Sequence, residues 1–340
     1  MKKVYINSAV SISAQNTFED DAFLRSAKIL TKEKTNAIYP DFKEFIVVSS
    51  LRRMATGVKM GVTAAKKALI GANIEMPDAI LTGTGMGCIE DTEKFLNTLI
   101  KNNEAYLTPT PFIQSTHNTV GGTIALALQC KGYNNTFTNG AVSFESALLD
   151  AKMGIDEGLN NILIGGVDEL GLEFIDYLNL IEEQKDKPLK VSLGEGAQFF
   201  VISSKKEKAV VEVLDVIIFG KISEENIEKE LKNFLKENEI SEAEIDATIL
   251  GKNGDGFDVY YEILQNGLFS ETQQLHYKHL CGEYFTASSF GFWAGIQILK
   301  TRTIPEILKL NSDVKNNYKT ILLYNQFKGE NHSFILLRRC

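Results

Sequence analysis

The sequence has 340 residues, of which 44% are hydrophobic and 24% are charged, and its formal net charge is −8. This composition is typical of a folded protein with room for two core-forming units, and it argues against a disordered chain. The negative charge argues against a general nucleic-acid surface, which needs clustered cations that displace counterions from phosphates.

The N-terminus MKKVYINSAVSISAQ resembles a signal peptide, but Asn7 and Ser8 interrupt an apolar stretch that is too short for its hydrophobic region. We therefore expect a β-strand there and a cytoplasmic protein. No segment approaches the ~20 apolar residues of a membrane helix. The four cysteines show neither CxxC pairing nor the density of a disulfide scaffold, which fits a reducing cytosol and gives little support to a metal site.

Strands and helices alternate along the first half. The predicted elements are a strand at 4–10, an amphipathic helix at 51–72, a strand at 79–82 that runs into a glycine-rich turn, a helix at 118–129, a strand, turn and helix over 135–158, and a strand at 162–164 that ends in two glycines and two carboxylates. The glycine-rich turn has the pattern GxGxG, whereas the dinucleotide fingerprint is GxGxxG, so we expect a structural turn and no nucleotide cofactor.

Strands are predicted next at 194–204 and 210–218. The second half then repeats this order on a smaller scale, with an amphipathic helix at 223–238 that Ser223 caps, a strand at 247–251, a helix at 289–300 and a strand at 320–327. The alternation predicts α/β layers with buried, mostly parallel strands, and a site between the halves.

The stretch TFTNGAVSFESALLDA (136–151) has the pattern of a strand that turns sharply into a helix. Many enzymes present a nucleophile at such a bend. Here the residue at the bend is Ala141, whose methyl group cannot attack a substrate.

Eight motifs follow one another in the order LRRM, GTGMG, PFIQSTHNTVGG, GYNNTFTNGA, LIGGVDE, LGEGAQFFVI, KHLCGEYFTASS and QFKGENHSFILL. With these motifs the chain resembles the β-ketoacyl synthases, condensing enzymes of the thiolase fold, over nearly its whole length. The resemblance implies a thiolase-like α/β fold of two pseudo-repeated αβαβα halves with layered mixed sheets. We place the halves at 1–205 and 206–340, and we expect no metal and no cofactor.

In that family the bend carries a cysteine that accepts the acyl chain, and two histidines from the second half stabilise the enolate and the oxyanion. Counted from the matching motifs, the cysteine position falls on Ala141, and the histidine positions fall on Asn253 and Glu283. The family's lysine upstream of the second histidine is retained as Lys278. The resemblance therefore implies that no member of the catalytic set is intact.

Two residues are candidates to replace the missing thiol. Ser143 lies two residues past the bend and has no evident base, and Cys281 is expected to be a small buried residue. Loss of the thiol alone would leave a decarboxylase, but here both imidazoles are absent too, and an ionised Glu283 would repel an enolate.

A scaffold without its catalytic set is similar to the chain-length factors, which pair with a Cys-bearing ketosynthase and share its acyl carrier protein. Members of that branch carry glutamine at the cysteine position, whereas this chain has alanine. The resemblance implies that the partner-facing tunnel residues are Phe112, Ile113, Gln114 and Asn118, and that Phe327 and Lys328 form the gate. Two alternatives stay open, namely an active condensing or acyl-transfer enzyme with reassigned residues, and a homodimeric protein that binds an acyl or aromatic ligand.

Other polar signals are weaker. Asp168 and Glu169 could form an acid/base pair, but a cap or surface role is the favoured interpretation, and NGDGFD (253–258) lacks the ligand spacing of a calcium loop. His117 is expected to lie at a helix start or interface, and the charged run 182–188 is expected to be a solvated loop.

Overall fold

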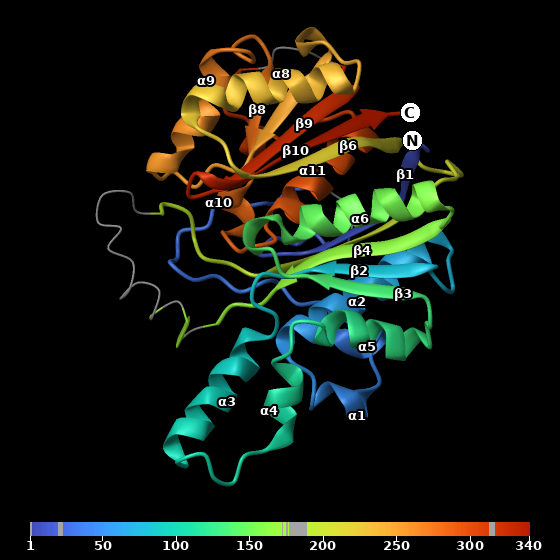
Figure 1. The fold of residues 1–340 in the computed structure, drawn as a ribbon, viewed down its shortest axis with the longest axis vertical. Coiled ribbons are helices and arrows are strands. Elements are labelled where there is room, and N and C mark those ends of the chain that lie inside the picture. Colours follow the sequence, from blue (N-terminus) through green and yellow to red (C-terminus); the bar gives the residue numbers. More distant parts are fainter. Residues whose placement is uncertain (1, 20–22, 172, 175, 177–188, 313–316) are drawn as a thin grey trace.

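Five alternating layers of helices and strands make up the fold. The structure is a computed structural model that describes residues 2–19, 23–171, 173–174, 176, 189–312 and 317–340. Figure 1 shows the layers in the order helices, sheet, helices, sheet, helices, with α6 and α11 in the middle layer. An arm made of α3 and α4 extends from one end of this stack.

The sequence builds two sets of five strands. The first set and its helices are β1 (Val4–Ile12), α1 (Val48–Leu51), α2 (Thr56–Ala72), β2 (Ala79–Gly83), α3 (Ile89–Lys101), α4 (Pro109–Gln114), α5 (Thr119–Leu128), β3 (Tyr133–Phe137), α6 (Ser143–Glu157), β4 (Asn161–Asp168) and β5 (Gly196–Ser203). The second set comprises β6 (Val211–Lys221), α8 (Ile227–Glu237), β7 (Ala247–Leu250), α9 (Val259–Asn266), β8 (Gln273–His276), α10 (Lys278–Cys281), α11 (Ser288–Thr301), β9 (Thr320–Phe327) and β10 (Glu330–Arg339).

The strand order reveals the internal repeat. The strands run β3-β2-β4-β5-β1-β6-β10-β9-β7-β8, so the second set has the order of the first when each strand is matched five places on. Among the described residues, strand pairing between the two sets joins Val4 and Tyr5 of β1 to Val213 and Glu212 of β6. Two pseudo-repeated αβαβα halves are therefore confirmed, whereas the division at 205/206 stays a prediction.

The strand pairing corrects one expectation. The pairs β2–β3, β2–β4, β7–β8 and β7–β9 are parallel, but the pairs that include β1, β5, β6 or β10 are antiparallel. The sheets are therefore mixed, and the expectation of mostly parallel strands was wrong. One reason is that β9 passes into β10 through residues 328–329 alone, and antiparallel neighbours need no crossover helix.

Alternation along the buried strands assigns their side chains to three cores. On β2, Leu81 points into the central core between the sheets, while Ile80 packs against α2 and α5 on the outer face. On β9, Leu323 likewise enters the central core, and Leu322 packs under α8 and α9. Because successive residues of a strand point to opposite faces, apolar strands buried on both sides produce this five-layer stack.

Two element boundaries differ from the predictions. The helix expected at 51–72 begins at Thr56, because residues 52–55 form a turn and the carboxylate of Glu169, 112 positions away, accepts the N–H of Gly57. Ser223 was expected to cap a helix from 223, but α8 begins at Ile227, and the Ser223 hydroxyl accepts a hydrogen bond from the side chain of Asn226. The run 182–188 lies outside the described residues.

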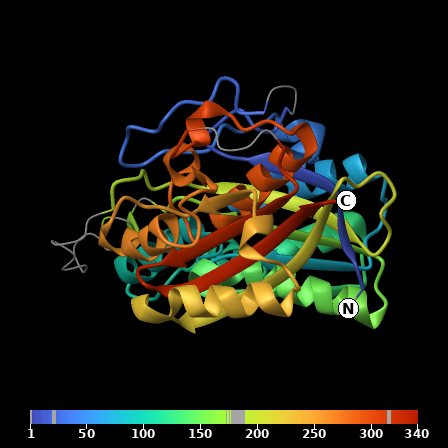
Figure 2. The same cartoon turned by 90° about the horizontal axis from the view of Figure 1, so that it is seen from above.

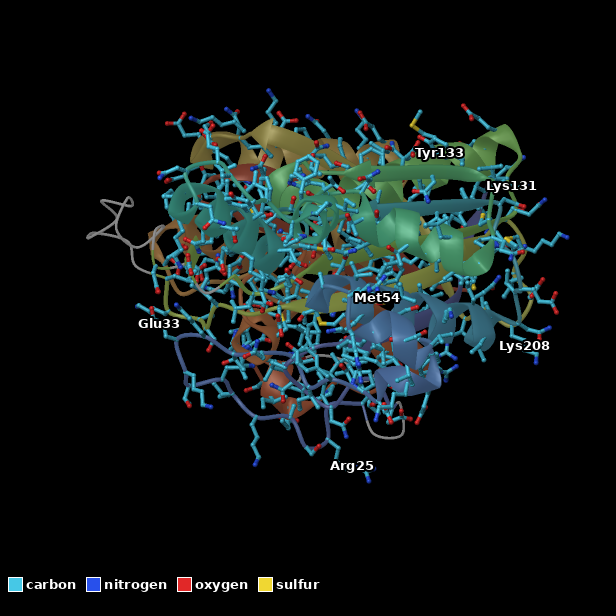
Figure 3. The ribbon with its side chains drawn as sticks, turned by 90° about the horizontal axis from the view of Figure 1, so that it is seen from below. Arg25, Glu33, Met54, Lys131, Tyr133 and Lys208 are labelled. Atoms are coloured by element: carbon cyan, nitrogen blue, oxygen red, sulfur yellow. The ribbon has the colours of Figure 1, made fainter. Side chains whose placement is uncertain are left out.

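The surfaces show where the ends and the free edges lie. The two ends of the chain lie on the same side of the molecule (Figures 1 and 2). From below, Met54 lies beside α2, and Tyr133 marks β3, the outermost strand of the first set (Figure 3). No helix in the described part of the chain is long and apolar enough to cross a membrane.

Candidate functional site

The bend that the sequence analysis singled out has the geometry of a nucleophile turn without the nucleophile. Gly140 has φ +56°, a left-handed conformation that glycine adopts without strain, and the chain then enters α6. Ala141 at the bend is 1% exposed. The hydroxyl of Ser143 donates to the carbonyl of Gly140 at 2.6 Å, so it is engaged locally rather than presented to a substrate.

A buried ion pair occupies the place expected for the second histidine. Nζ of Lys278 lies 2.5 Å from Oε2 of Glu283, and the two side chains are 1% and 6% exposed. Burial raises the pKa of Glu283, while the positive charge of Lys278 lowers it. Separating the two charges would leave each of them buried without a partner, which costs free energy. The ion pair therefore fixes the positions of both side chains.

Asn253 lies next to this pair. The side chain of Asn253 is 1% exposed, and its interaction with the Glu283 carboxyl lowers the pKa of Glu283. Neither Nδ2 nor Oδ1 of Asn253 has a hydrogen bond of normal geometry within the described residues. The structure therefore brings Asn253, Lys278 and Glu283 together, as the resemblance implied.

Glu145 is a site residue that the sequence analysis missed. It lies in the first turn of α6, is fully buried, and accepts a hydrogen bond from Oγ of Ser333 at 2.9 Å. Burial raises the pKa of Glu145 to about 7, although hydrogen bonds from Ser288 and Ser333 and the charge of Lys278 oppose the rise. A glutamate in the first turn of a helix normally complements the helix dipole at the surface, so the sequence carried no signal that it would be buried.

The two carboxylates at the end of β4, Asp168 and Glu169, hold loops and helices. Asp168 accepts hydrogen bonds from Thr84 and Gly85 through Oδ1 and from the N–H and hydroxyl of Thr286 through Oδ2. Glu169 accepts the N–H of Gly57 at 2.6 Å and that of Glu90 at 2.9 Å, near the first turns of α2 and α3. The cap role predicted for the two carboxylates is confirmed, but both lie inside the protein, not on its surface.

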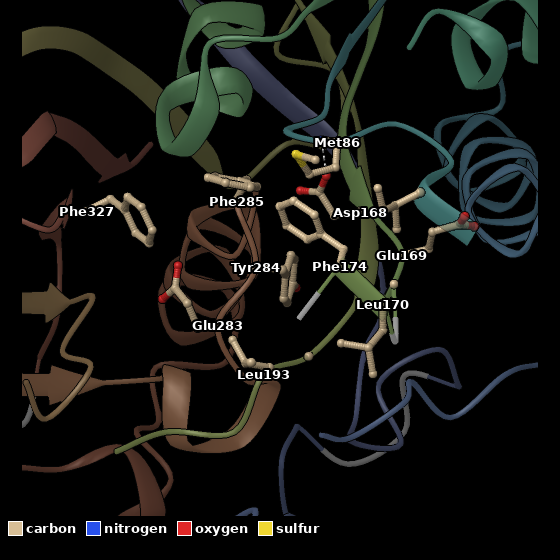
Figure 4. Close-up of a pocket in the computed structure, with 13 residues that line it drawn as sticks. Met86, Asp168, Glu169, Leu170, Phe174, Leu193, Glu283, Tyr284, Phe285 and Phe327 are labelled. Carbon is tan, nitrogen blue, oxygen red and sulfur yellow. Dashed lines mark hydrogen bonds between the residues drawn. The ribbon is translucent and has the colours of Figure 1, made fainter. Parts of the chain in front are cut away.

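A pocket of ≈ 100 Å³, partly open to solvent, lies beside the ion pair (Figure 4). Its lining is mainly apolar and aromatic and consists of Met86, Ile89, Asp168, Glu169, Leu170, Gly171, Phe174, Leu193, Gly194, Glu283, Tyr284, Phe285 and Phe327. Phe327 packs against Phe285 with ring centroids 5.6 Å apart, and Nζ of Lys328 lies 5.0 Å from the Phe327 centroid. Phe327 therefore lines the pocket, with Lys328 stacked on its ring.

The predicted tunnel residues lie on a different part of the molecule. Phe112 and Ile113 of α4 are 55% and 58% exposed, and Asn118 is also exposed. Phe112 packs on Phe95 of α3 with centroids 5.3 Å apart. None of these residues, nor Gln114, lines the pocket. They belong to the arm that extends from the layers in Figure 1.

The remaining polar candidates have ordinary roles. Cys281 is fully buried, and burial raises the pKa of its thiol well above the usual range. His117 is exposed. In NGDGFD, Asp258 accepts the N–H groups of Asn253 and Gly254, which accounts for the turn. The described residues contain no cluster of three or more ligands that could hold a metal.

Comparisons with known proteins agree with this geometry. Residues 31–190 match the model of the β-ketoacyl synthase N-terminal domain. No curated protein sequence matches the chain.

Solved structures resemble the chain over its whole length. The ishigamide ketosynthase/chain length factor matches with TM-score 0.81 and 15% identity, covering 100% of this chain and 99% of that one. The ketosynthase ApeO in complex with its chain length factor ApeC from Xenorhabdus doucetiae matches with TM-score 0.77 and 14% identity, covering 100% and 98%. The complex AntDE:AntF, an acyl-carrier protein of a type II PKS with its ketosynthase bound to the hexaketide, matches with TM-score 0.76 and 14% identity, covering 100% of both chains. The chain therefore has the thiolase-like ketosynthase fold, and its residues 31–190 are similar to the N-terminal domain of the β-ketoacyl synthases.

Proposed function

We propose that this chain is a catalytically silent, chain-length-factor-like subunit that pairs with a Cys-bearing ketosynthase. In this role it shapes the acyl tunnel of the pair in polyketide, aryl polyene or fatty-acid-type biosynthesis. The observation that carries the proposal is the chemistry of the bend and its surroundings: the residue at the bend is the buried Ala141, and the motif order assigns Asn253 and Glu283 to the positions of the family's two histidines.

The site chemistry argues against turnover by this chain alone. Condensation needs a thiolate that takes the acyl group and donors that stabilise the developing negative charge. Ala141 supplies no thiolate, and the ion-paired carboxylate of Glu283 is an acceptor, so it opposes negative charge where a donor is needed. The alternative of reassigned residues is weakened because the Ser143 hydroxyl is bound to the carbonyl of Gly140 and the Cys281 thiol is buried with a raised pKa.

The arm supplies a surface for the catalytic partner. Besides Phe112 and Ile113, it exposes Leu96, Ile100 and Tyr106, which are 48%, 72% and 93% exposed. Contiguous exposed apolar side chains mark interaction surfaces, and their burial is worth roughly 25 cal/mol per Å². In the proposed heterodimer, Phe112, Ile113, Gln114 and Asn118 reach the partner's acyl tunnel, and bulk there limits the number of carbons that fit.

The proposed partners agree with the solved relatives. Two of the similar structures are named as ketosynthases with a chain length factor, and a third holds an acyl carrier protein with its ketosynthase. We extend both partners to this chain, and we assign Phe327 with Lys328 as the gate of its own pocket, where the lysine narrows the entrance by its size.

The proposal is tested by native mass spectrometry of the tagged chain purified from its own host. We expect a one-to-one complex with a second ketosynthase that carries the cysteine and both histidines. A homodimer that retains an acyl or aromatic mass would instead support the ligand-binding alternative, and a covalent acyl adduct on this chain would support the enzyme alternative.

The tunnel role has its own test. In the reconstituted pair, the double variant Phe112→Ala with Ile113→Ala should lengthen the product by at least one extension unit, because it removes bulk at the proposed end of the tunnel. Ile70→Ala, which truncates a residue of α2 that is 70% exposed, is the matched control and should leave the product length unchanged. An unchanged product length in both variants would show that the arm does not line the acyl tunnel.

A further inference from the structure

The pocket beside the ion pair has carboxylates among its lining residues and no cationic residue. Asp168, Glu169 and Glu283 belong to the lining, and no lysine, arginine or histidine of the described residues does. Figure 4 shows Glu283 between the rings of Phe327 and Tyr284, with Asp168 and Glu169 on the other side of the pocket. Among the lining residues that the structure describes, a ligand with a negative charge would meet acceptors and no positive side chain.

Only one of these carboxylates has an oxygen left for a ligand. Both oxygens of Asp168 accept hydrogen bonds from Thr84, Gly85 and Thr286, and both oxygens of Glu169 accept helix N–H groups. In Glu283, Oε2 faces Lys278 at 2.5 Å and the side chain of Asn253 interacts with the carboxylate, but no hydrogen bond of normal geometry from the described residues reaches Oε1. A carboxylate that is 94% removed from solvent and retains a free acceptor needs a donor, so its position in the pocket points to a ligand group.

The charge balance selects the kind of donor. Lys278 is 1% exposed and lies behind Glu283, so it neutralises the carboxylate without being offered to the pocket. The pair is neutral as a whole, and a neutral hydroxyl or amide N–H satisfies Oε1 without bringing another charge into an apolar space. The remaining lining of leucine, methionine, isoleucine and aromatic side chains suits an apolar body.

We infer that this pocket binds an apolar ligand that carries a neutral hydrogen-bond donor, which is accepted by Glu283, and that it discriminates against carboxylates. Decarboxylation in the family requires the site to accept a malonyl carboxylate. We infer the opposite preference here, because this pocket discriminates against carboxylates. The inference does not rest on the partner-subunit proposal, because every residue of the pocket comes from one chain.

The test uses three probes with similar chains and different head groups. We expect isothermal titration calorimetry on the full-length protein to rank 1-nonanol above methyl octanoate, which has no donor, and to rank octanoate last, with the alcohol at least tenfold tighter than the carboxylate. Equal or tighter binding of octanoate, binding of the ester as tight as that of the alcohol, or no binding of nonanol would each overturn the inference.

Two variants locate the effect. Glu283→Gln should reduce the preference for the alcohol over the carboxylate to less than threefold, because its amide both donates and accepts. Where this variant does not fold, Lys278→Met combined with Glu283→Gln leaves no unpaired buried charge and should show the same loss of preference. Leu193→Trp, which fills the pocket from a half-buried lining position, should abolish binding of nonanol, and retained binding in that variant would place the ligand elsewhere.

Discussion

At the scale of single residues, the buried acids of this protein are the groups whose charge depends on folding. Glu145 and Glu169 are both almost completely buried, and burial raises the pKa of each from the ordinary value of 4.5 to about 7. Ser333 and two helix N–H groups oppose this rise without cancelling it. Both acids therefore keep their protons in the folded state at pH values where the unfolded chain has lost them.

The sign of the resulting pH dependence follows from linkage. A carboxyl with a raised folded pKa contributes stability that is complete below about pH 4.5 and is lost as the pH rises through about 7, here ~3 kcal/mol for Glu145. Glu145→Gln should therefore flatten the decline in free energy of unfolding between pH 5 and pH 8, measured by urea titration. Glu237→Gln, at an exposed position, is the control and should leave the decline unchanged. A decline as steep in Glu145→Gln as in the unmodified protein would contradict the assignment.

At the scale of elements, one carboxylate fixes where two helices begin. Glu169 at the end of β4 accepts N–H groups near the starts of both α2 and α3, and neither helix has a side-chain cap from its own N-cap residue. The N-terminal N–H groups of a helix have no partner within the helix, so an acceptor from another element satisfies them. The register of α2 and α3 against the first sheet is therefore set by a residue that is distant in sequence.

This cap predicts a measurable loss. Glu169→Ala leaves buried N–H groups at both helix starts without an acceptor, and we expect a decrease of ~2–4 kcal/mol in the free energy of unfolding near pH 7. Glu237→Ala removes an exposed glutamate of α8 and should change stability by less than ~0.5 kcal/mol. Equal stability of the two variants would show that solvent or another group satisfies these N–H groups.

At the scale of the whole molecule, the two halves share their central core. Phe144 of α6, from the first half, packs against Phe292 of α11, from the second, with centroids 5.3 Å apart. Apolar side chains from both sheets join the same cluster. Direct strand pairing between the sets is limited to Val4 and Tyr5 with β6. Packing in the middle layer therefore joins the halves, together with side-chain hydrogen bonds such as those from Thr286 to Asp168 and from Ser333 to Glu145.

We accordingly expect the halves to depend on each other. The fragments 1–205 and 206–340, expressed separately, should lack a cooperative unfolding transition, because each exposes a face of α6 or α11 that is buried in the whole chain. Co-expression of the two fragments should restore a transition that circular dichroism can follow. A fragment 1–205 that unfolds cooperatively, with the stability of the full chain, would show that the halves are independent domains.

The sequence by itself determined the order of the elements, the repeat and the chemistry that is missing. Period-2 and period-3.6 patterns located most strands and helices, and the motif order assigned Ala141, Asn253 and Glu283 to the family's catalytic positions. Such features are local, because they depend on residue type and spacing along the chain.

Only the tertiary structure decided how buried polar groups are satisfied. The start of α2 at Thr56, the double cap by Glu169, the burial of Glu145 and the ion pair of Lys278 with Glu283 all depend on what surrounds the side chains. Most of these contacts join residues that are far apart in the chain, and the charge state of a buried acid depends on its surroundings rather than on its residue type. The residue types at the site follow from the sequence, whereas the hydrogen bonds and charge states of their side chains depend on tertiary packing.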